Sequence, residues 1–216
     1  MENGQNHQRE STSLTNWSAE RQFLGRFYLS QGFNTRQQVS NDCGATSLAV
    51  VLNMLLFQAN LKSSPLEKGT ILERLRPRFW QRLPGWIPNV GGATSPWGLA
   101  AAFNELAEKI DLDWRAERKS HARRAHVLEQ LMTGKPVTAL KVWKNGGAHW
   151  VNLVRYSSEK DKLYYLDPNP YLEHLSPGKR LQSQTWSAFE ADWSRAAWWT
   201  RLLGIHCEII LYAKVM

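Results

Sequence analysis

The sequence predicts an α+β fold, in which a helical front half precedes a mainly antiparallel sheet. Segment 43–58 is apolar on nearly every side, which is typical of a buried central helix. After Gly134 the apolar residues change from helical spacing to the alternation of strands. A chain of 216 residues can bury a sizeable core without a disulfide or a metal. We therefore expect one domain over residues 23–216, preceded by a flexible polar leader over 1–22.

The front half contains three further segments with helix signals. Two begin with a serine followed by proline, the usual pair at an N-cap and first helical position. The third is followed by a glycine that is well placed to end it. These helices are expected over residues 64–76, 94–109 and 120–133. Residues 23–30 could form a first strand, and 77–95, rich in Pro, Gly and Trp, indicate a long loop.

The back half is dominated by strand-like segments. Strands are expected over residues 136–143, 148–156, 162–168 and 207–215. A short helix, T-W-S-A-F-E-A-D-W at 185–193, is expected between the last two.

Composition excludes several classes of protein. The net charge is +8, but no zinc-ligand spacing, glycine-rich phosphate loop or RNA-binding aromatic motif accompanies it, so we expect no nucleic-acid partner, metal or cofactor. No apolar run approaches the ~18 residues of a membrane span, and the first residues lack the apolar core of a signal peptide. Two cysteines favour a reducing compartment. A cytoplasmic monomer is expected.

The most informative position is a cysteine at the start of the apolar helix. Free amides and the helix dipole stabilise a thiolate there, which suits Cys43 as a nucleophile. His149 begins one predicted strand and Asp167 ends the next, so a hairpin would bring them to one edge of the sheet. A histidine can complete the activation of a thiol, and a carboxylate can orient the imidazole. Gln37 or Gln38 could supply an amide to an oxyanion hole.

These residues fall within two recognisable motifs. The string Q-Q-V-S-N-D-C-G-A-T-S resembles the nucleophile motif of papain-like cysteine peptidases, in particular the bacteriocin leader-processing (double-glycine leader) type and its stand-alone relatives, peptidase family thirty-nine. Gln37, Asp42, Cys43 and Gly44 match that motif at the same spacing. H-W-V-N-L followed by L-D-P matches the second motif, with a tryptophan in place of the commoner tyrosine. The sequence departs from the family at Thr46, where alanine is usual.

The resemblance implies a papain-like fold, with a central helix packed on a twisted antiparallel sheet. It also implies cleavage of a peptide or protein substrate through a thioester acyl-enzyme. In that reaction Cys43 is the nucleophile, His149 the base and Asp167 the residue that orients the imidazole. Gln37 would stabilise the oxyanion, with Gln38 as the alternative.

Other functions use the same residues. A thioester intermediate also serves acyl transferases, deamidases and isopeptidases, and related domains without catalysis bind peptides. Three tryptophans in loop or motif positions, Trp86, Trp97 and Trp150, could line a peptide cleft. The second cysteine, Cys207, lies in a predicted apolar strand and is expected to serve packing.

Overall fold

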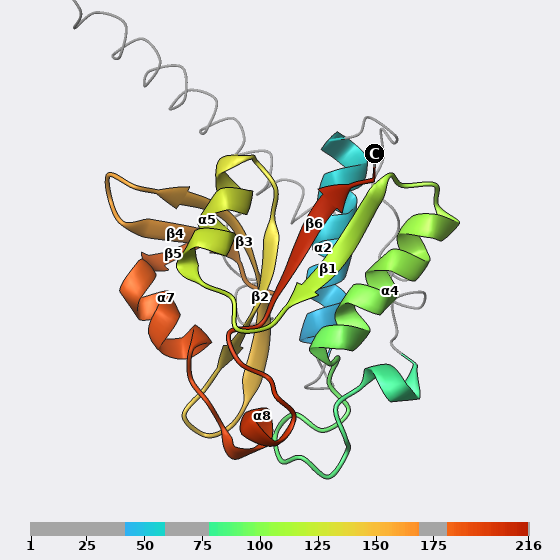
Figure 1. The fold of residues 1–216 in the computed structure, drawn as a ribbon, viewed down its shortest axis with the longest axis vertical. Coiled ribbons are helices and arrows are strands. Elements are labelled where there is room, and N and C mark those ends of the chain that lie inside the picture. Colours follow the sequence, from blue (N-terminus) through green and yellow to red (C-terminus); the bar gives the residue numbers. More distant parts are fainter. Residues whose placement is uncertain (1–41, 59–77, 169–180, 216) are drawn as a thin grey trace, which may run out of the picture.

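A six-stranded, wholly antiparallel sheet is the framework of the molecule (Figure 1). The computed structural model describes residues 42–58, 78–168 and 181–215. The strands are β1 (Trp114–Lys119), β2 (Val137–Val142), β3 (Ala148–Ser157), β4 (Lys162–Leu166), β5 (Leu181–Thr185) and β6 (Ile209–Lys214). Their order in the sheet is β1-β6-β2-β3-β4-β5. The last strand of the sequence therefore lies inside the sheet, between β1 and β2.

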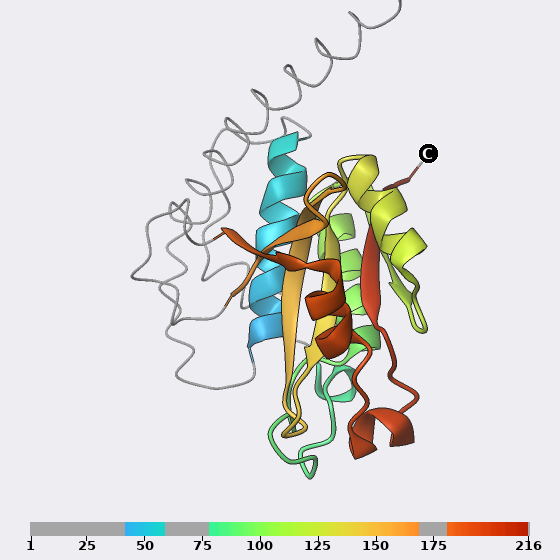
Figure 2. The same cartoon turned by 90° about the vertical axis from the view of Figure 1, so that its left-hand side faces the viewer.

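Helices cover both faces of the sheet. Among the described residues they are α2 (Cys43–Gln58), α4 (Pro96–Lys109), α5 (Arg124–Met132), α7 (Trp186–Trp193) and α8 (Trp198–Leu202), together with the 3₁₀ turn η1 (Phe79–Gln81). Helix α2 lies on one side of β3 and α5 on the other (Figure 2). Alternate residues of β3 accordingly enter two separate apolar cores, Trp150 on the α2 side and Val151 on the α5 side.

Burial of its apolar side chains holds the central helix in place. Leu48, Val51, Leu52 and Leu55 are each fully buried, and a side chain of this kind contributes about 1.5–3 kcal/mol when it leaves water. Helix α4 starts as expected, because the Ser95 side chain accepts a hydrogen bond from the Gly98 amide. The buried central helix and the antiparallel sheet expected from the sequence are confirmed.

Several elements differ from the expected ones. Helix α5 starts four residues late because His121 has a left-handed φ of 52°, which a helix does not accept, and its amide donates to the His206 carbonyl. Cys207 has a φ of 46° and precedes β6 instead of lying within it. Strands β1 and β5 and helix α8 were not expected from the sequence. The expected leader, first strand and helix 64–76 lie outside the described residues. Within the described ranges, no helix is long and apolar enough to cross a membrane.

Candidate active site

Cys43 is the first residue of α2. The helix begins with a hydrogen bond from the Thr46 amide to the Asp42 carbonyl, at 2.9 Å. The preceding amides of the first turn have no partner within the helix, and the positive end of its dipole lies beside the thiol. Gly44 allows a close approach here, since a Cβ at this position would lie 2.7 Å from the Cβ of Thr94. The start of the helix is therefore packed tightly against the loop that precedes α4.

Two hydrogen bonds join α2 to β3, and a third joins β3 to the loop before α4. The Ser47 hydroxyl donates to the Trp150 carbonyl at 3.2 Å, and the Asn152 side-chain amide donates to the Ser47 carbonyl at 3.0 Å. The Trp150 indole donates to the Thr94 carbonyl at 3.1 Å. Ser47 is one helical turn from Cys43, and Trp150 adjoins His149. These bonds therefore set the position of the nucleophile relative to the histidine.

His149 and Asp167 meet across the β3–β4 hairpin. Asn152 pairs with Leu166 in the register of the two strands, so Asp167, just after β4, lies near the start of β3. The His149 Nε2–H donates to the Asp167 Oδ1 at 2.6 Å. This bond leaves Nδ1 as the ring nitrogen available to the thiol of Cys43. The hairpin expected from the sequence thus brings the histidine and the carboxylate together.

The surroundings of His149 favour its charged form. Burial acts most strongly and lowers the pKa of the imidazole, but hydrogen bonds to Asp167 and Cys43, with the negative charges of both, raise it to about 10. The imidazole therefore carries two protons at neutral pH, one held by the carboxylate and one facing the sulfur. Such a ring is already a proton donor before any substrate binds.

Trp143 is a site residue that the sequence reasoning missed. Its ring stacks on the His149 ring, with centroids 5.6 Å apart and planes 16° from parallel. A Cβ at Gly147 would lie 2.9 Å from the Trp143 Cε3, so this glycine makes room for the indole. The Trp143 side chain remains 42% exposed. The signal in the sequence was the W-K-N-G-G-A turn directly before the histidine strand, in which the glycines allow the aromatic ring to fold back.

The three tryptophans expected in a cleft have different environments. Trp150 is only 1% exposed and belongs to the core, so the expectation that it lines a cleft is wrong. Trp97 is half-buried under the guanidinium of Arg118. Trp86 is 62% exposed and stacks on Trp198, with ring centroids 6.0 Å apart.

Two other expectations concern the oxyanion donor and a metal site. Gln37 and Gln38 lie outside it, so the oxyanion donor stays a prediction. Within residues 42–58, 78–168 and 181–215, no three His, Cys, Asp or Glu side chains converge as a metal site requires.

Comparison with known proteins shows which family the chain is similar to. The model of the Peptidase_C39-like family matches residues 28–197. The chain belongs to this family. A crystal structure of a candidate C39-like peptidase from Bacillus anthracis matches this C39-like protein with 18% identity and a TM-score of 0.50, over 82% of this chain and 92% of that one. The peptidase domain of Streptococcus ComA, a bifunctional ABC transporter involved in quorum sensing, matches with 15% identity and a TM-score of 0.47, over 81% and 92%.

No curated protein matches the sequence of this C39-like protein. The family match nevertheless confirms the membership that the two motifs indicated. The solved C39-like structure confirms the α+β fold expected from them.

Proposed function

We propose that this C39-like protein is a cysteine peptidase that cleaves peptide bonds through a thioester acyl-enzyme. The observation that carries the proposal is the short bond from His149 Nε2 to Asp167, which turns the other ring nitrogen toward Cys43 at a helix N-terminus. This is the arrangement that activates a thiol nucleophile.

Acylation would follow from these positions. Cys43 Sγ attacks the substrate carbonyl carbon, a C–S bond forms, and the carbonyl oxygen takes the negative charge. The backbone amide of Cys43 and the side-chain amide of Gln37 donate to this oxyanion. The C–N bond then breaks while His149 Nδ1 gives its proton to the leaving amine.

Deacylation reverses the direction of proton transfer. Water attacks the thioester carbonyl and His149 takes one of its protons. The C–S bond breaks, and the new carboxylic acid leaves the thiolate of Cys43 beside the imidazolium. Asp167 holds the ring in one orientation throughout, so Nδ1 exchanges the proton in both half-reactions.

The test is cleavage of a tryptic digest of a bacterial proteome, with products identified by mass spectrometry. The wild-type protein should release new peptides, Cys43→Ala should release none, and Cys207→Ala should behave as the wild type. Cys207 is the matched control because it is the other cysteine, half-buried and outside the site. Equal cleavage by Cys43→Ala and the wild type would refute the proposal.

A further inference from the structure

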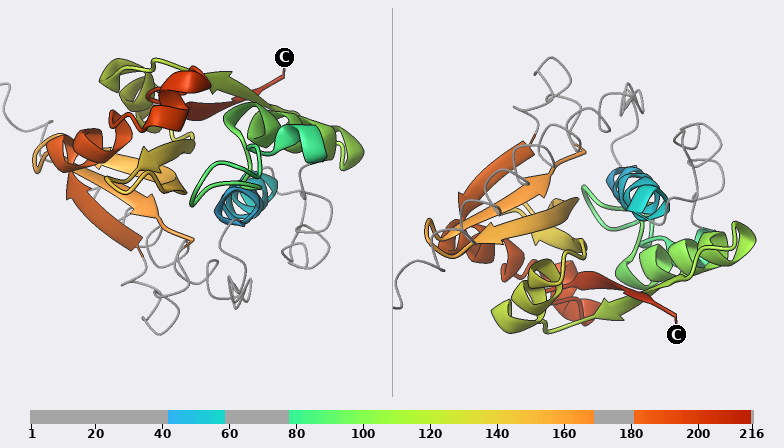
Figure 3. Two further views of the ribbon diagram at one scale, coloured as in Figure 1. Left: turned by 90° about the horizontal axis from the view of Figure 1, so that it is seen from below. Right: turned by 90° about the horizontal axis from the view of Figure 1, so that it is seen from above.

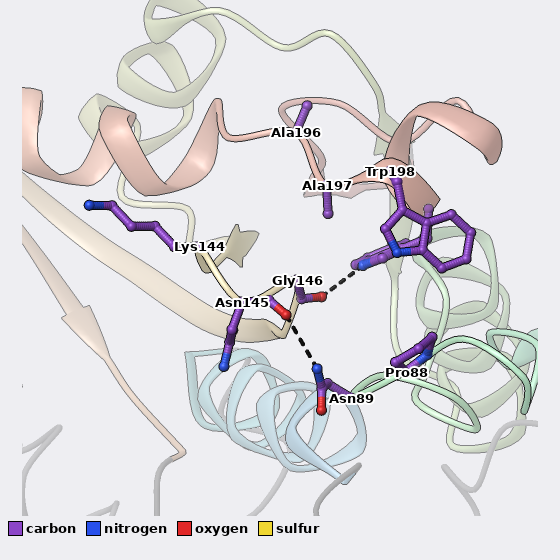
Figure 4. A pocket seen from close by; sticks show the side chains of 9 residues that line it. Pro88, Asn89, Lys144, Asn145, Gly146, Ala196, Ala197 and Trp198 are labelled. Carbon is purple, nitrogen blue, oxygen red and sulfur yellow. Dashed lines mark hydrogen bonds between the residues drawn. The ribbon is translucent and has the colours of Figure 1, made fainter.

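A pocket of about 350 Å³ is drawn with its lining residues in Figure 4. Seen from below, α8, the loop before α4 and the start of α2 lie at the same end of the molecule (Figure 3). Three segments line the pocket: residues 88–89 of the loop before α4, residues 144–146 of the β2–β3 turn, and residues 196–199 at the start of α8. Cys43, His149 and Asp167 are not among its lining residues.

Hydrogen bonds from two sides fix the turn that forms the floor of the pocket. The Asn89 side-chain amide donates to the Asn145 carbonyl at 3.3 Å. The indole of Trp199, which is fully buried, donates to the Gly146 carbonyl at 2.7 Å. Figure 4 shows both bonds reaching the turn from separate segments. The walls are therefore formed before any ligand arrives, which lowers the entropic cost of binding.

The same turn continues into the candidate active site. The Trp143 amide donates to the Gly147 carbonyl at 2.8 Å and closes the turn at its base. The Trp143 ring lies on His149, and the next residue along the turn, Lys144, already lines the pocket. A peptide passing over Trp143 would reach the pocket directly.

The chemistry of the proposed reaction decides which part of a substrate passes there. His149 must give its proton to the leaving nitrogen, so this nitrogen has to lie beside the imidazole. The residues that follow the scissile bond then leave the site on the side of His149 and its stacked indole. The acyl part stays with Cys43.

The walls indicate what kind of side chain fits. The indole of Trp198, which is 55% exposed, the methyl groups of Ala196 and Ala197, and the ring of Pro88 form apolar surface. Among the described residues of the lining, Lys144 alone is charged. An apolar side chain gains from contact with this indole, and a neighbouring carboxylate gains from the lysine.

We propose that this pocket binds the leaving segment of a peptide substrate, with a bulky apolar side chain beside Trp198 and an acidic residue near Lys144. The inference rests on the proposed peptidase function and adds a preference on the leaving side of the bond.

The test uses the same tryptic proteome digest and compares residue frequencies at each position on both sides of the cleaved bonds. The variants are Trp198→Ala and Lys144→Glu. The control is Trp80→Ala, which removes a tryptophan that is 65% exposed and does not line the pocket. Thermal unfolding of each variant checks that the fold is kept.

Wild-type protein and Trp80→Ala should prefer bulky apolar residues over alanine at one leaving-side position, on the order of tenfold. Trp198→Ala should lose this preference without changing the preferences on the acyl side. Lys144→Glu should change the preference at the neighbouring leaving-side position from acidic to basic residues. Cleavage with no leaving-side preference, or a preference unchanged in Trp198→Ala, would overturn the inference while the peptidase function stands. No cleavage by the wild type would refute the proposed function, and this inference with it.

Discussion

At the scale of single residues, the proton on His149 decides how the site behaves with pH. Asp167 and Cys43 raise the pKa of this imidazole to about 10 against the opposing effect of burial. The general acid of the proposed reaction is therefore charged over the whole neutral range and is lost only in alkaline solution.

Asp167→Asn removes the carboxylate charge but keeps an oxygen that can accept from Nε2. The alkaline limb of kcat/KM should therefore move to lower pH, while kcat falls far less than in Cys43→Ala. A pH profile of peptide cleavage measures both effects. An alkaline limb that stays in place would show that Asp167 does not set the pKa of His149.

The two cysteines should differ in reactivity. Burial, together with the charges of Glu190 and Glu208, raises the pKa of the Cys207 thiol. Cys43 is paired with the imidazolium and, at 5% exposure, is the less accessible of the two. Iodoacetamide near pH 6 should nevertheless alkylate Cys43 and spare Cys207, as peptide mass spectrometry would show. His149→Ala should slow the labelling of Cys43 at pH 6 and less so at pH 9. If the more exposed Cys207 is alkylated faster than Cys43, the thiol of Cys43 is not activated.

Trp143 is expected to act as a positioning residue. Its ring covers one face of the imidazolium, an interaction worth about 0.5–2 kcal/mol. Trp143→Ala should lower kcat roughly tenfold and move the alkaline limb of the kcat/KM profile to lower pH. Trp143→Phe should restore most of the kcat and most of the wild-type pH profile. If Phe and Ala behave alike, the indole acts through something other than the stacked ring.

The sequence predicted which residues come together at this site better than it predicted their surroundings. Cys43, His149 and Asp167 were identified because motif spacing and the ends of predicted strands are local properties. The place of Trp143 over His149 depends on how a glycine-rich turn folds back, and the burial of Trp150 depends on where α2 packs. The spacing of residues along the sequence determines neither the fold of this turn nor the packing of α2.

At the scale of secondary structure, the contact between α2 and the loop before α4 is the most restrictive feature near the nucleophile. Gly44→Ala would place a Cβ 2.7 Å from Thr94 Cβ and 3.1 Å from a Leu99 methyl carbon. The start of the helix would have to shift, so we expect a loss of about 1–3 kcal/mol in the free energy of unfolding and a lower kcat.

Gly85→Ala is the control for that substitution. A Cβ at Gly85 meets no atom within 4 Å, so the free energy of unfolding and kcat should stay near those of the wild type. Urea unfolding measures the first quantity and peptide cleavage the second. Equal effects of the two substitutions would show that crowding at Thr94 is not the cause.

The elements that the sequence missed share a physical reason. Strand β1 (W-R-A-E-R-K) and strand β5 (L-Q-S-Q-T) are largely polar and lie at the two edges of the sheet, where few apolar residues are needed. The early start expected for α5 failed because a backbone contact to His206, remote in sequence, holds His121 in a left-handed conformation.

At the scale of the whole molecule, the charge on His149 links folding to pH. Its pKa in the folded protein exceeds the ordinary value of 6.5, so the stabilisation is complete below about pH 6.5 and is lost as the pH rises towards about 10. The wild type should lose more stability than His149→Ala between pH 7 and pH 10, as thermal unfolding at both values would measure. Equal losses would contradict a raised pKa.

The position of β6 also bears on how the protein is made. This strand, at 209–214, lies between β1 and β2, which precede it in the sequence by about 70 residues or more. During synthesis β1 cannot join the part of the sheet formed by β2 to β5 until β6 has left the ribosome. Until then the sheet lacks the strand that connects its two parts. Residues far apart in the sequence therefore have to be present together before the six strands can form one sheet.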